Sequence, residues 1–248
     1  KCFSPLKAER LENGMDIAFV RDIAGGVLCS EKVQGEGHGG REAYEYEYYN
    51  EEIVSKTAKT AFRLAGNRRG KVTNLDKSNV LGSSRLWRQT VNRAAVEFPQ
   101  VNLEHLYIDN AAMELIRDPG RFDVFVTSNL FGDIISDEGT ELTGTPYLYP
   151  SAEISGTEQG IYTPNQLHYP DESVIGKNLV NPIGMIAAAA QMLHLSFGLE
   201  AEAGAIEEAI RQVLAANIAT ADIWHKGKIL VGTKEMGKRI ADEIEAVS

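Results

Sequence analysis

The chain has 248 residues, of which 43% are hydrophobic and 24% charged, the balance of an ordinary globular protein of one large or two smaller domains. This composition excludes a disordered chain and a collagen-like fibre, and its most apolar stretch, residues 183–195, is too short to cross a bilayer. A net charge of −10 argues against nucleic-acid binding, and two cysteines cannot form a disulfide framework, so we expect a reducing, cytoplasmic location.

The first part of the chain predicts a buried strand, an arm and a helix. Residues 16–21 form an apolar run that ends before Gly25-Gly26. The Gly-rich and then Tyr-rich segment 27–50 alternates in polarity and predicts a hairpin arm. Asn50 is the expected N-cap of a helix, because two acids follow it in the first turn. The expected apolar stripe of that helix is Ile53, Thr57, Ala61 and Leu64.

Three strand–loop–helix units follow. The predicted strands are residues 71–76, 101–108 and 122–127. The predicted helices run from a cap at Ser83 or Ser84 to Phe98, over 110–116, and over about 132–142. Alternation of strands and helices predicts an α/β fold with parallel strands and right-handed crossovers.

The last third of the chain has a different pattern. Residues 143–182 are rich in Gly, Pro, Tyr and Ser, and they predict a long ordered loop. Two helices are expected after it, over 182–197 and about 199–216. The expected core stripe of the second helix is Leu199, Ala203, Ile206, Ile210 and Val213.

Candidate functional residues gather after the predicted strands. Ligands of parallel α/β sheets bind at the carboxyl ends of the strands, and these ends carry Arg21, Lys77, Asn79, Asp109 and the run 128–138. Cationic and acidic side chains are therefore expected at one edge of the sheet.

Two aspartates of the run 128–138 indicate a metal site. Asp133 and Asp137 are four residues apart on a predicted helix, so both carboxylates lie on one side of it. With Asp109 they would offer three carboxylates, which suit magnesium or manganese. On spacing alone, solvated surface acids are the commoner interpretation.

Two cations have alternative interpretations. Lys77 suits a general base or proton shuttle, although a surface lysine at a strand end is the commoner case. Arg21 suits a clamp for a carboxylate, or equally an interface ion pair. No histidine pair has zinc-ligand spacing, and the chain lacks a nucleophile elbow, a dinucleotide-binding glycine motif and a Walker loop.

Three ordered motifs carry a resemblance to a known family. They are residues 71–81 (KVTNLDKSNVL), 107–113 (YIDNAAM) and 129–137 (NLFGDIISD). Together they resemble the β-decarboxylating dehydrogenases of the isocitrate/isopropylmalate dehydrogenase family, and most specifically the 3-isopropylmalate dehydrogenases. The similarity runs from about residues 4–7 (SPLK) to the C-terminus.

The resemblance implies an enzyme of leucine biosynthesis, which oxidises and decarboxylates 3-isopropylmalate to 2-oxoisocaproate with NAD and magnesium or manganese. It implies a metal site of Asp133, Asp137 and the Asp109 of a partner subunit. Arg21 would hold the substrate's carboxylate. The lysine matching Lys77, again from the partner, would bind the substrate and be the catalytic base, and Asp109 would also be a catalytic residue.

The resemblance also implies a two-domain fold and a homodimer that shares its active sites. The family has a large domain built from both chain ends and a smaller middle domain that carries the arm. By that map, residues 1–143 are the middle domain, with the arm at about 27–50. Residues 144–248 are then the C-terminal half of the large, cofactor-binding domain.

Three departures from the family pattern stand out. The family's N-terminal segment is absent before residues 4–7, so we expect either more chain than these residues or an inactive form. The family's catalytic tyrosine, which follows Gly-Gly, is replaced by Leu28, and Tyr44, Tyr46, Tyr48 and Tyr49 are the candidates to substitute for it.

The third departure is the cofactor loop. The family's loop is shorter and carries a His-Gly pair, whereas residues 162–172 read YTPNQLHYPDE. The side chains expected to bind NAD are Asn79, His168, Asp171 (or its neighbour Glu172) and Asn181. A carboxylate at the adenosine ribose favours NAD over NADP.

Alternative functions remain open at this point. The same chemistry suits another malate-type acid, namely D-malate, tartrate, isocitrate or homoisocitrate. Leu28 and the altered loop are also compatible with a non-catalytic regulatory subunit of the same fold. A nucleotide-binding module without redox chemistry is less favoured, because the substrate-side residues match better than the cofactor loop does.

Overall fold

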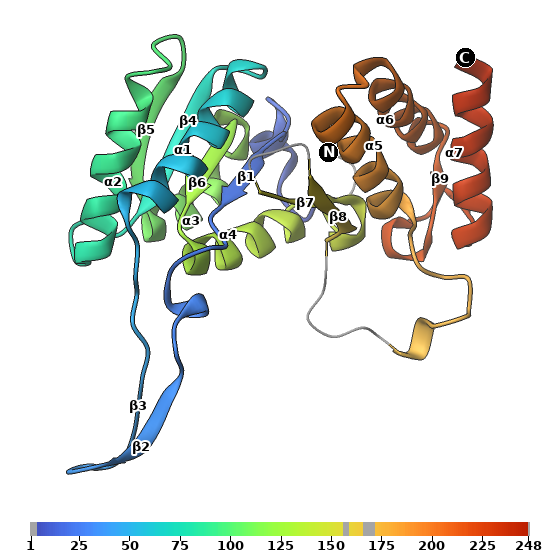
Figure 1. The fold of residues 1–248 in the computed structure, drawn as a ribbon. Coiled ribbons are helices and arrows are strands. Elements are labelled where there is room, and N and C mark those ends of the chain that lie inside the picture. Colours follow the sequence, from blue (N-terminus) through green and yellow to red (C-terminus); the bar gives the residue numbers. More distant parts are fainter. Residues whose placement is uncertain (1–3, 156–158, 166–171, 248) are drawn as a thin grey trace. The chain divides into compact units, whose positions relative to one another are not determined.

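The computed structural model describes residues 4–155, 159–165 and 172–247. The chain divides into two compact units, Lys1–Leu142 and Thr143–Ser248, and each is described by itself (Figure 1). Short 3-10 helices lie in both: η1 (Ala8–Leu11), η2 (Val27–Cys29), η3 (Pro119–Arg121), η4 (Pro146–Leu148), η5 (Glu172–Val174) and η6 (Ala221–Ile223).

The first unit is built on a parallel sheet, as the alternation of elements predicted. Its strands are β1 (Ala18–Arg21), β4 (Lys71–Asp76), β5 (Asn102–Tyr107) and β6 (Val124–Thr127). Their order across the sheet is β1-β6-β4-β5, and all three pairings are parallel. The predicted strands are thus confirmed, with ends that differ by one or two residues.

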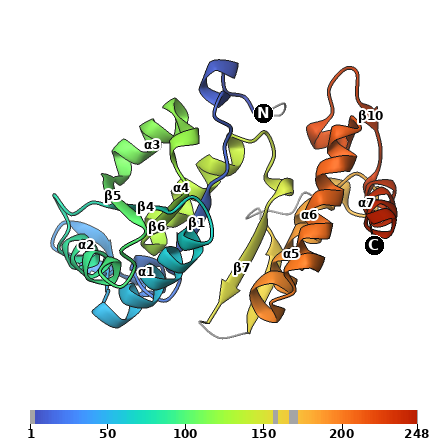
Figure 2. The same cartoon turned by 90° about the horizontal axis from the view of Figure 1, so that it is seen from above.

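Two helices cover each face of this sheet, as Figure 2 shows from above. They are α1 (Glu51–Gly66) and α2 (Gly82–Ala95) on one face, and α3 (Ile108–Arg117) and α4 (Asn129–Glu141) on the other. Each face has its own apolar core: Phe62 and Trp87 belong to the first, and Phe122 and Phe125 to the second. Crossover helices on both faces explain why the central strands β4 and β6 are buried almost throughout.

The predicted cap of α1 is confirmed, but its predicted stripe is wrong in part. Asn50 Oδ1 accepts the backbone N–H of Ile53 at 2.9 Å. The buried face comprises Val54, Ala58, Ala61, Phe62 and Ala65. Phe62 belongs to the core between this helix and the sheet, and its ring stacks on that of Phe98 with centroids 5.4 Å apart. Ile53, Thr57 and Leu64 are consequently only half-buried.

The serine cap predicted for α2 is also wrong. This helix begins at Gly82, and its capping residue, Leu81, makes no side-chain cap bond. Ser84 is buried within the first turn, while the hydroxyl of Ser83 donates to the carboxylate of Glu47. Both serines therefore face tertiary neighbours, which the local pattern does not contain.

A buried aspartate joins the amino ends of the strands. Asp123 is 1% exposed, and its carboxylate accepts Arg68 Nε at 2.8 Å and the backbone N–H groups of Arg69 and Lys71 at 3.0 and 3.3 Å. Arg68 also donates to Asp16 on the approach to β1. The side chain of Arg68, which bonds both Asp16 and Asp123, thus joins three segments that are distant in sequence.

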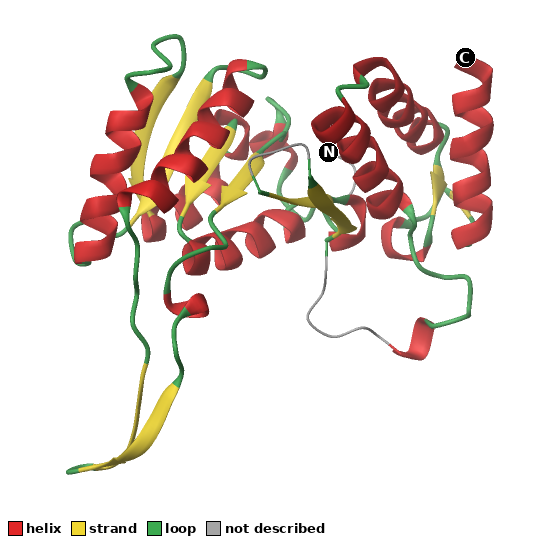
Figure 3. Cartoon of the chain, viewed as in Figure 1, coloured by secondary structure: helices red, strands yellow, loops and turns green. Residues whose placement is uncertain are grey.

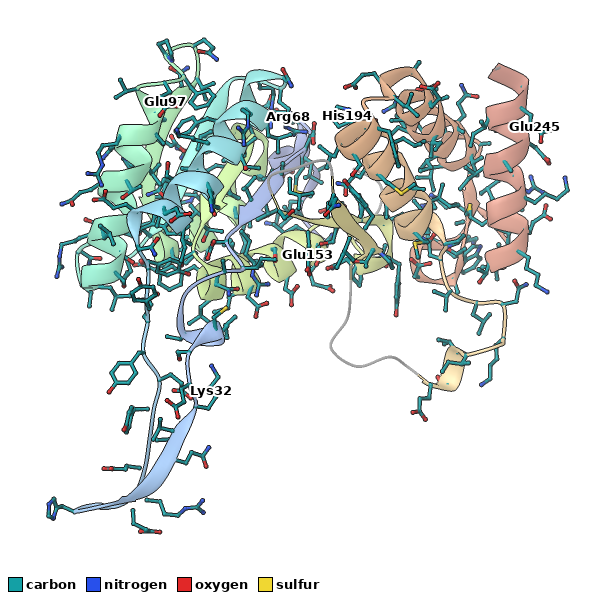
Figure 4. All side chains as sticks on the ribbon, viewed as in Figure 1. Lys32, Arg68, Glu97, Glu153, His194 and Glu245 are labelled. Carbon is teal, nitrogen blue, oxygen red and sulfur yellow. The ribbon has the colours of Figure 1, made fainter. Side chains whose placement is uncertain are left out.

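The predicted arm is confirmed as an antiparallel hairpin of β2 (Val33–Gly37) and β3 (Gly40–Tyr44). Figure 3 shows that it extends away from the sheet of its own unit on two long loops. Lys32, labelled in Figure 4 where the arm begins, donates to the backbone carbonyls of Leu28 and Ser30 at 3.3 and 3.2 Å. Every residue of β3 is exposed, so the arm buries almost nothing within its own chain.

The second unit combines a hairpin with three helices. Its elements are β7 (Pro150–Ile154), β8 (Gly160–Pro164), α5 (Ile183–Phe197), α6 (Glu200–Ala215), β9 (Ile218–Ala219), β10 (Ile229–Leu230) and α7 (Thr233–Val247). The loop predicted over residues 143–182 is therefore wrong in part, because β7 and β8 pair within it. The helices predicted as α5 and α6 are confirmed.

The core of this unit lies between α5, α6 and α7. It includes Ile183, Ala209, Val213, Met236 and Ile240. Of the stripe predicted for α6, Ala203 and Val213 are buried, Ile206 and Ile210 are half-buried, and Leu199 is 40% exposed. In the described part of the chain, no helix has the length and apolar character of a membrane span.

Candidate active site

The candidate side chains lie along one edge of the parallel sheet. The strands end there with Arg21 of β1, Thr127 of β6, Asp76 of β4 and Tyr107 of β5. Arg21 and Tyr107 therefore stand on opposite edge strands, three strand spacings or roughly 14 Å apart. Two groups of functional side chains form, one at each end of this row.

The first group is centred on Arg21. Its guanidinium donates from Nη1 to Asp133 Oδ1 at 2.5 Å and from Nε to Asn129 Oδ1 at 2.9 Å. The side chains of Arg21 and Asp133 are 30% and 32% exposed, so the ion pair is open on one side. Asp137 lies one turn further along α4 and is exposed. The helix predicted for the two aspartates is confirmed, which gives both carboxylates one face.

Gly132 allows this arrangement. A Cβ on Gly132 would lie 2.7 Å from Arg21 Cγ, 2.9 Å from Arg21 Cβ and 2.9 Å from Thr127 Cγ2. The side chain of Arg21 therefore crosses α4 where the helix has no side chain. A larger residue at this position would displace the guanidinium from Asp133.

We expect Gly132→Ala to weaken substrate binding by about tenfold or more, because displacement of a positioned group by 1 Å is costly to a site. The measurement is the KM for the hydroxy acid. Gly204→Ala in α6 is the control, since a Cβ there has no atom within 4 Å. That control is expected to add up to about 1 kcal/mol of stability without changing KM. An unchanged KM in Gly132→Ala would contradict the role assigned to Gly132.

The second group is centred on Lys77, the first residue after β4. Its ammonium donates to Asp109 Oδ1 in the first turn of α3, and it lies 5.9 Å from the ring centroid of Tyr107. The hydrogen bond from Lys77 holds the pKa of the Asp109 carboxyl below its usual value. Asp109 is 57% exposed, so this pair is also accessible from outside.

A buried polar network lies behind Lys77. Asp76 is 1% exposed and accepts both Nε and Nη2 of Arg88, at 2.7 and 3.0 Å. It also accepts Asn74 Nδ2 at 2.6 Å and the backbone N–H of Ser78 at 2.9 Å. These hydrogen bonds compensate the negative charge of Asp76. Its bidentate ion pair with Arg88 fixes the backbone that leads to Lys77.

His105 completes this network in a neutral form. Asn74 Nδ2 donates to its Nδ1 at 3.0 Å, so its Nε2 carries the proton and donates to Asn92 Oδ1 at 2.9 Å. Burial, together with the nearby charge of Arg88, lowers the pKa of His105. The histidine is therefore a structural hydrogen-bonding group of the sheet.

The three candidate metal ligands do not meet within one chain. Among the described residues, no group of three or more His, Cys, Asp or Glu side chains is close enough to hold a metal ion. Asp133 and Asp137 belong to the Arg21 end of the row, and Asp109 belongs to the Lys77 end. A site with all three would need Asp109 from a second copy, and this assignment stays a prediction.

The candidate cofactor residues have different surroundings. Asn79 is exposed in the turn between β4 and α2. Asn181 is 5% exposed and uses its amide internally: Nδ2 donates to Asp222 at 3.1 Å and Oδ1 accepts the N–H of Ile183 at 3.0 Å. It therefore bonds the first residue of α5, and its NAD-binding role stays a prediction. His168 and Asp171 lie outside the described residues, and Glu172 begins η5.

The tyrosines differ in their suitability to replace the hydroxyl missing at Leu28. Leu28 is 43% exposed in η2. Tyr44, Tyr46 and Tyr48 are 45–66% exposed and belong to the arm or its base. Only the hydroxyl of Tyr49 among these residues is bonded within the Arg21 group, where it accepts the N–H of Asn129 at 2.8 Å, and Tyr49 is only 7% exposed.

Sequence reasoning missed Asn129 and the Asp76–Arg88 pair. Asn129 lies inside a motif that was assigned for its aspartates. Asp76 and Arg88 are twelve residues apart, on a strand and a helix, and no local pattern joins them. The one available signal was a charged residue within a predicted strand, because such a residue requires a partner when it is buried.

Comparison with known proteins gives a consistent result. The family model described as isocitrate/isopropylmalate dehydrogenase matches residues 1–240. A 3-isopropylmalate dehydrogenase of Clostridium acetobutylicum is 43% identical over 244 residues, which are 98% of this chain and 68% of that protein. One of Vibrio vulnificus is 45% identical over 245 residues, which are 98% of this chain and 67% of that protein.

Solved structures agree on the fold. Isocitrate dehydrogenase from Methylococcus capsulatus superposes with a TM-score of 0.81 at 29% identity, covering 91% of this chain and 66% of that one. A protein from Thermus thermophilus has a TM-score of 0.84 at 26% identity, covering 98% and 48%. This chain thus spans about two thirds of the length of the curated relatives. With a parallel sheet, an arm, and aspartates and cations in the family's order along one sheet edge, the chain belongs to the isocitrate/isopropylmalate dehydrogenase family.

Proposed function

We propose that the protein acts as a 3-isopropylmalate dehydrogenase, which oxidises its hydroxy diacid with NAD and releases the β-carboxylate as CO₂. Family membership makes it a β-decarboxylating hydroxy acid dehydrogenase, and the relatives at 43–45% identity are 3-isopropylmalate dehydrogenases. The observation that carries the proposal is the pair of half-sites on one sheet edge, Arg21 with Asp133 and Lys77 with Asp109.

Arg21 is suited to bind a substrate carboxylate. Of its five N–H groups, two donate to Asn129 and Asp133. The planar fork of a guanidinium matches a carboxylate, and Arg21 is charged at every physiological pH. A diacid held here would present its hydroxyl beside the aspartates of α4.

Lys77 is proposed as the residue that takes the proton of the substrate's hydroxyl. Removal of this proton accompanies transfer of the hydride from the same carbon to NAD, so a base must lie beside the hydroxyl. The ammonium of Lys77 is 28% exposed and tethered by Asp109, which leaves it accessible from the sheet edge.

Asp133 and Asp137 suit a divalent cation. Two carboxylates on one face of α4 are the oxygen ligands that magnesium or manganese prefers, and Asp109 of a second copy would be the third. When bound, such an ion stabilises negative charge on the substrate oxygen. The residues proposed for NAD are Asn79, His168, Asp171 and Asn181.

A homodimer with shared active sites is part of this proposal, and the strand order supports it. Lys77 and Asp109 of one chain stand at the far end of the row from its own Arg21 and Asp133. The exposed apolar side chains of α3 and α4, among them Met113 and Ile134, would be covered by a second copy. The arm, which buries little in its own chain, suits a clasp between subunits.

The domain assignment and location belong to the same proposal. The first unit would be the middle domain of the family and the second a part of its cofactor-binding domain. We propose a cytoplasmic location, which suits the free and exposed thiol of Cys29.

The test is an assay of the full-length protein for NADH formation with 3-isopropylmalate, NAD and magnesium. D-malate, tartrate, isocitrate and homoisocitrate serve as competing substrates. We expect 3-isopropylmalate to have the highest kcat/KM and chelation of the metal to abolish turnover. Turnover with none of these acids would refute the proposed activity, and preference for another acid would refute the substrate.

A further inference from the structure

We propose that Asn129 is a positioning residue, which sets the orientation of the Arg21 guanidinium, and that the hydroxyl of Tyr49 in turn fixes Asn129. The proposal rests on the proposed role of Arg21 in binding the substrate's carboxylate. It assigns a function to two side chains that contact neither a metal nor the reacting atoms.

The first observation is the hydrogen bonding of Asn129. This side chain begins α4 and is 3% exposed. Its Oδ1 accepts Arg21 Nε at 2.9 Å, and its Nδ2 donates to the carbonyl of Gly25 at 3.0 Å and to Cys29 Sγ at 3.5 Å. A guanidinium only donates and a carbonyl only accepts, so rotation of the amide by 180° would break both main bonds. The acceptor is therefore held facing Arg21.

The second observation is the way Tyr49 supports Asn129. The buried hydroxyl of Tyr49 accepts the backbone N–H of Asn129 at 2.8 Å, at the first residue of the helix. Its ring meets Trp87 edge-on, with centroids 5.2 Å apart. Burial raises the pKa of Tyr49 to about 12, so the group stays a neutral hydroxyl.

The Gly25-Gly26 turn is shaped for this tyrosine. A Cβ on Gly25 would lie 2.6 Å from the ring of Tyr49, and a Cβ on Gly26 would lie 2.6 Å from its hydroxyl oxygen. Gly26 also has a φ of 80°, which favours glycine. The turn, the tyrosine and the start of α4 thus form one close-fitting unit around Asn129.

The third observation is that Arg21 has two acceptors of different character. Asp133 is a charged carboxylate and a proposed metal ligand, so its oxygens would be shared with a bound cation. Asn129 is a neutral amide and is not a proposed metal ligand. Its bond to Arg21 Nε would therefore be unaffected when a cation binds the oxygens of Asp133. A guanidinium fixed at Nε keeps both terminal nitrogens directed outward for a carboxylate.

The expected consequence is a selective loss of substrate affinity. In Asn129→Ala, we expect the KM for 3-isopropylmalate to rise by about 10- to 100-fold, while the KM for NAD stays within twofold, since misplacement by 1 Å has effects of this order. In Tyr49→Phe, which keeps the ring and removes the acceptor for Asn129, we expect a smaller rise in the same KM.

Tyr48→Phe is the matched control. Tyr48 is the neighbouring tyrosine and is 62% exposed, and its hydroxyl accepts a 3.3 Å bond from Asn50 Nδ2. It should leave the KM for 3-isopropylmalate within twofold. Titration calorimetry with 3-isopropylmalate gives a second readout, in which the affinity should fall in the order wild type, Tyr49→Phe, Asn129→Ala.

The outcomes separate this inference from the proposed function. A merely structural role would lower the melting temperature and change both KM values equally, and that result would overturn the inference. Wild-type turnover with unchanged KM in Asn129→Ala and Tyr49→Phe would overturn it as well. Wild-type protein that neither binds nor oxidises any of the assayed diacids would refute the proposed function and the inference with it.

Discussion

Replacement of Lys77 by methionine is expected to lower kcat by about 10²- to 10⁴-fold, the range that a positioned general base contributes. Methionine keeps the length and part of the apolar stem but cannot accept a proton. The KM for NAD should change little, because the side chain is assigned to proton transfer. The measurement is steady-state kinetics with 3-isopropylmalate.

Lys71→Met is the matched control for this experiment. Lys71 is at the opposite end of the same strand, has the same 28% side-chain exposure, and lies at the same 5.9 Å from an aromatic ring, that of Phe122. Its ion pair with Glu104 is partly exposed, and its loss should cost no more than about 1 kcal/mol. Equal kinetic losses in the two variants would contradict the role assigned to Lys77.

Lys77→Met also has a consequence for pH dependence. The bond from Lys77 lowers the pKa of Asp109 in the folded protein, so the pair stabilises the fold at pH values above the ordinary carboxyl pKa and less so as pH falls through the lowered value. In the variant, the pKa of Asp109 should rise toward its ordinary value. Carbon-detected NMR titration of the metal-free protein measures this shift.

Replacement of Asp123 by asparagine is expected to lower the free energy of unfolding by about 3 kcal/mol, the largest loss among the variants described. This value of about 3 kcal/mol is the lower end of the range for breaking a buried ion pair. The asparagine has one acceptor where the carboxylate serves Arg68 Nε and two backbone N–H groups. Arg68, which is 24% exposed, recovers part of its hydration, and this limits the loss. Urea unfolding measures the difference.

Asp16→Asn tests the other partner of the same arginine. Asp16 is 77% exposed and bonds Arg68 Nη2 at 2.8 Å, so its ion pair is solvated and its removal should cost less than about 1 kcal/mol. If the two variants unfold at the same urea concentration, burial of Asp123 does not have the energetic role described above.

The parallel sheet and its helices could be predicted because each element has a local signature. Residues 122–127 (FDVFVT) are a largely apolar run of strand length, and the helix after Asn50 has a capping side chain and two acids in its first turn. The face of α1 that is buried could not be predicted as accurately. Phe62 and Val54 are buried because they pack against the sheet. Helical periodicity alone is compatible both with the stripe that contains them and with the neighbouring stripe that begins at Ile53.

The sequence by itself determined the family, the α/β class, the arm, and which cations and carboxylates follow which strands, because these properties depend on residue types at short spacing. Only the tertiary structure decided that β1, which carries Arg21, is separated by β6 from β4, which precedes Lys77, because strand order is set by crossovers. It also decided that Asn129 bonds Arg21 across 108 residues and that Asp76 bonds Arg88 from strand to helix. Such partners are chosen by burial, which favours the pairing of polar groups and brings together side chains that have no common local pattern.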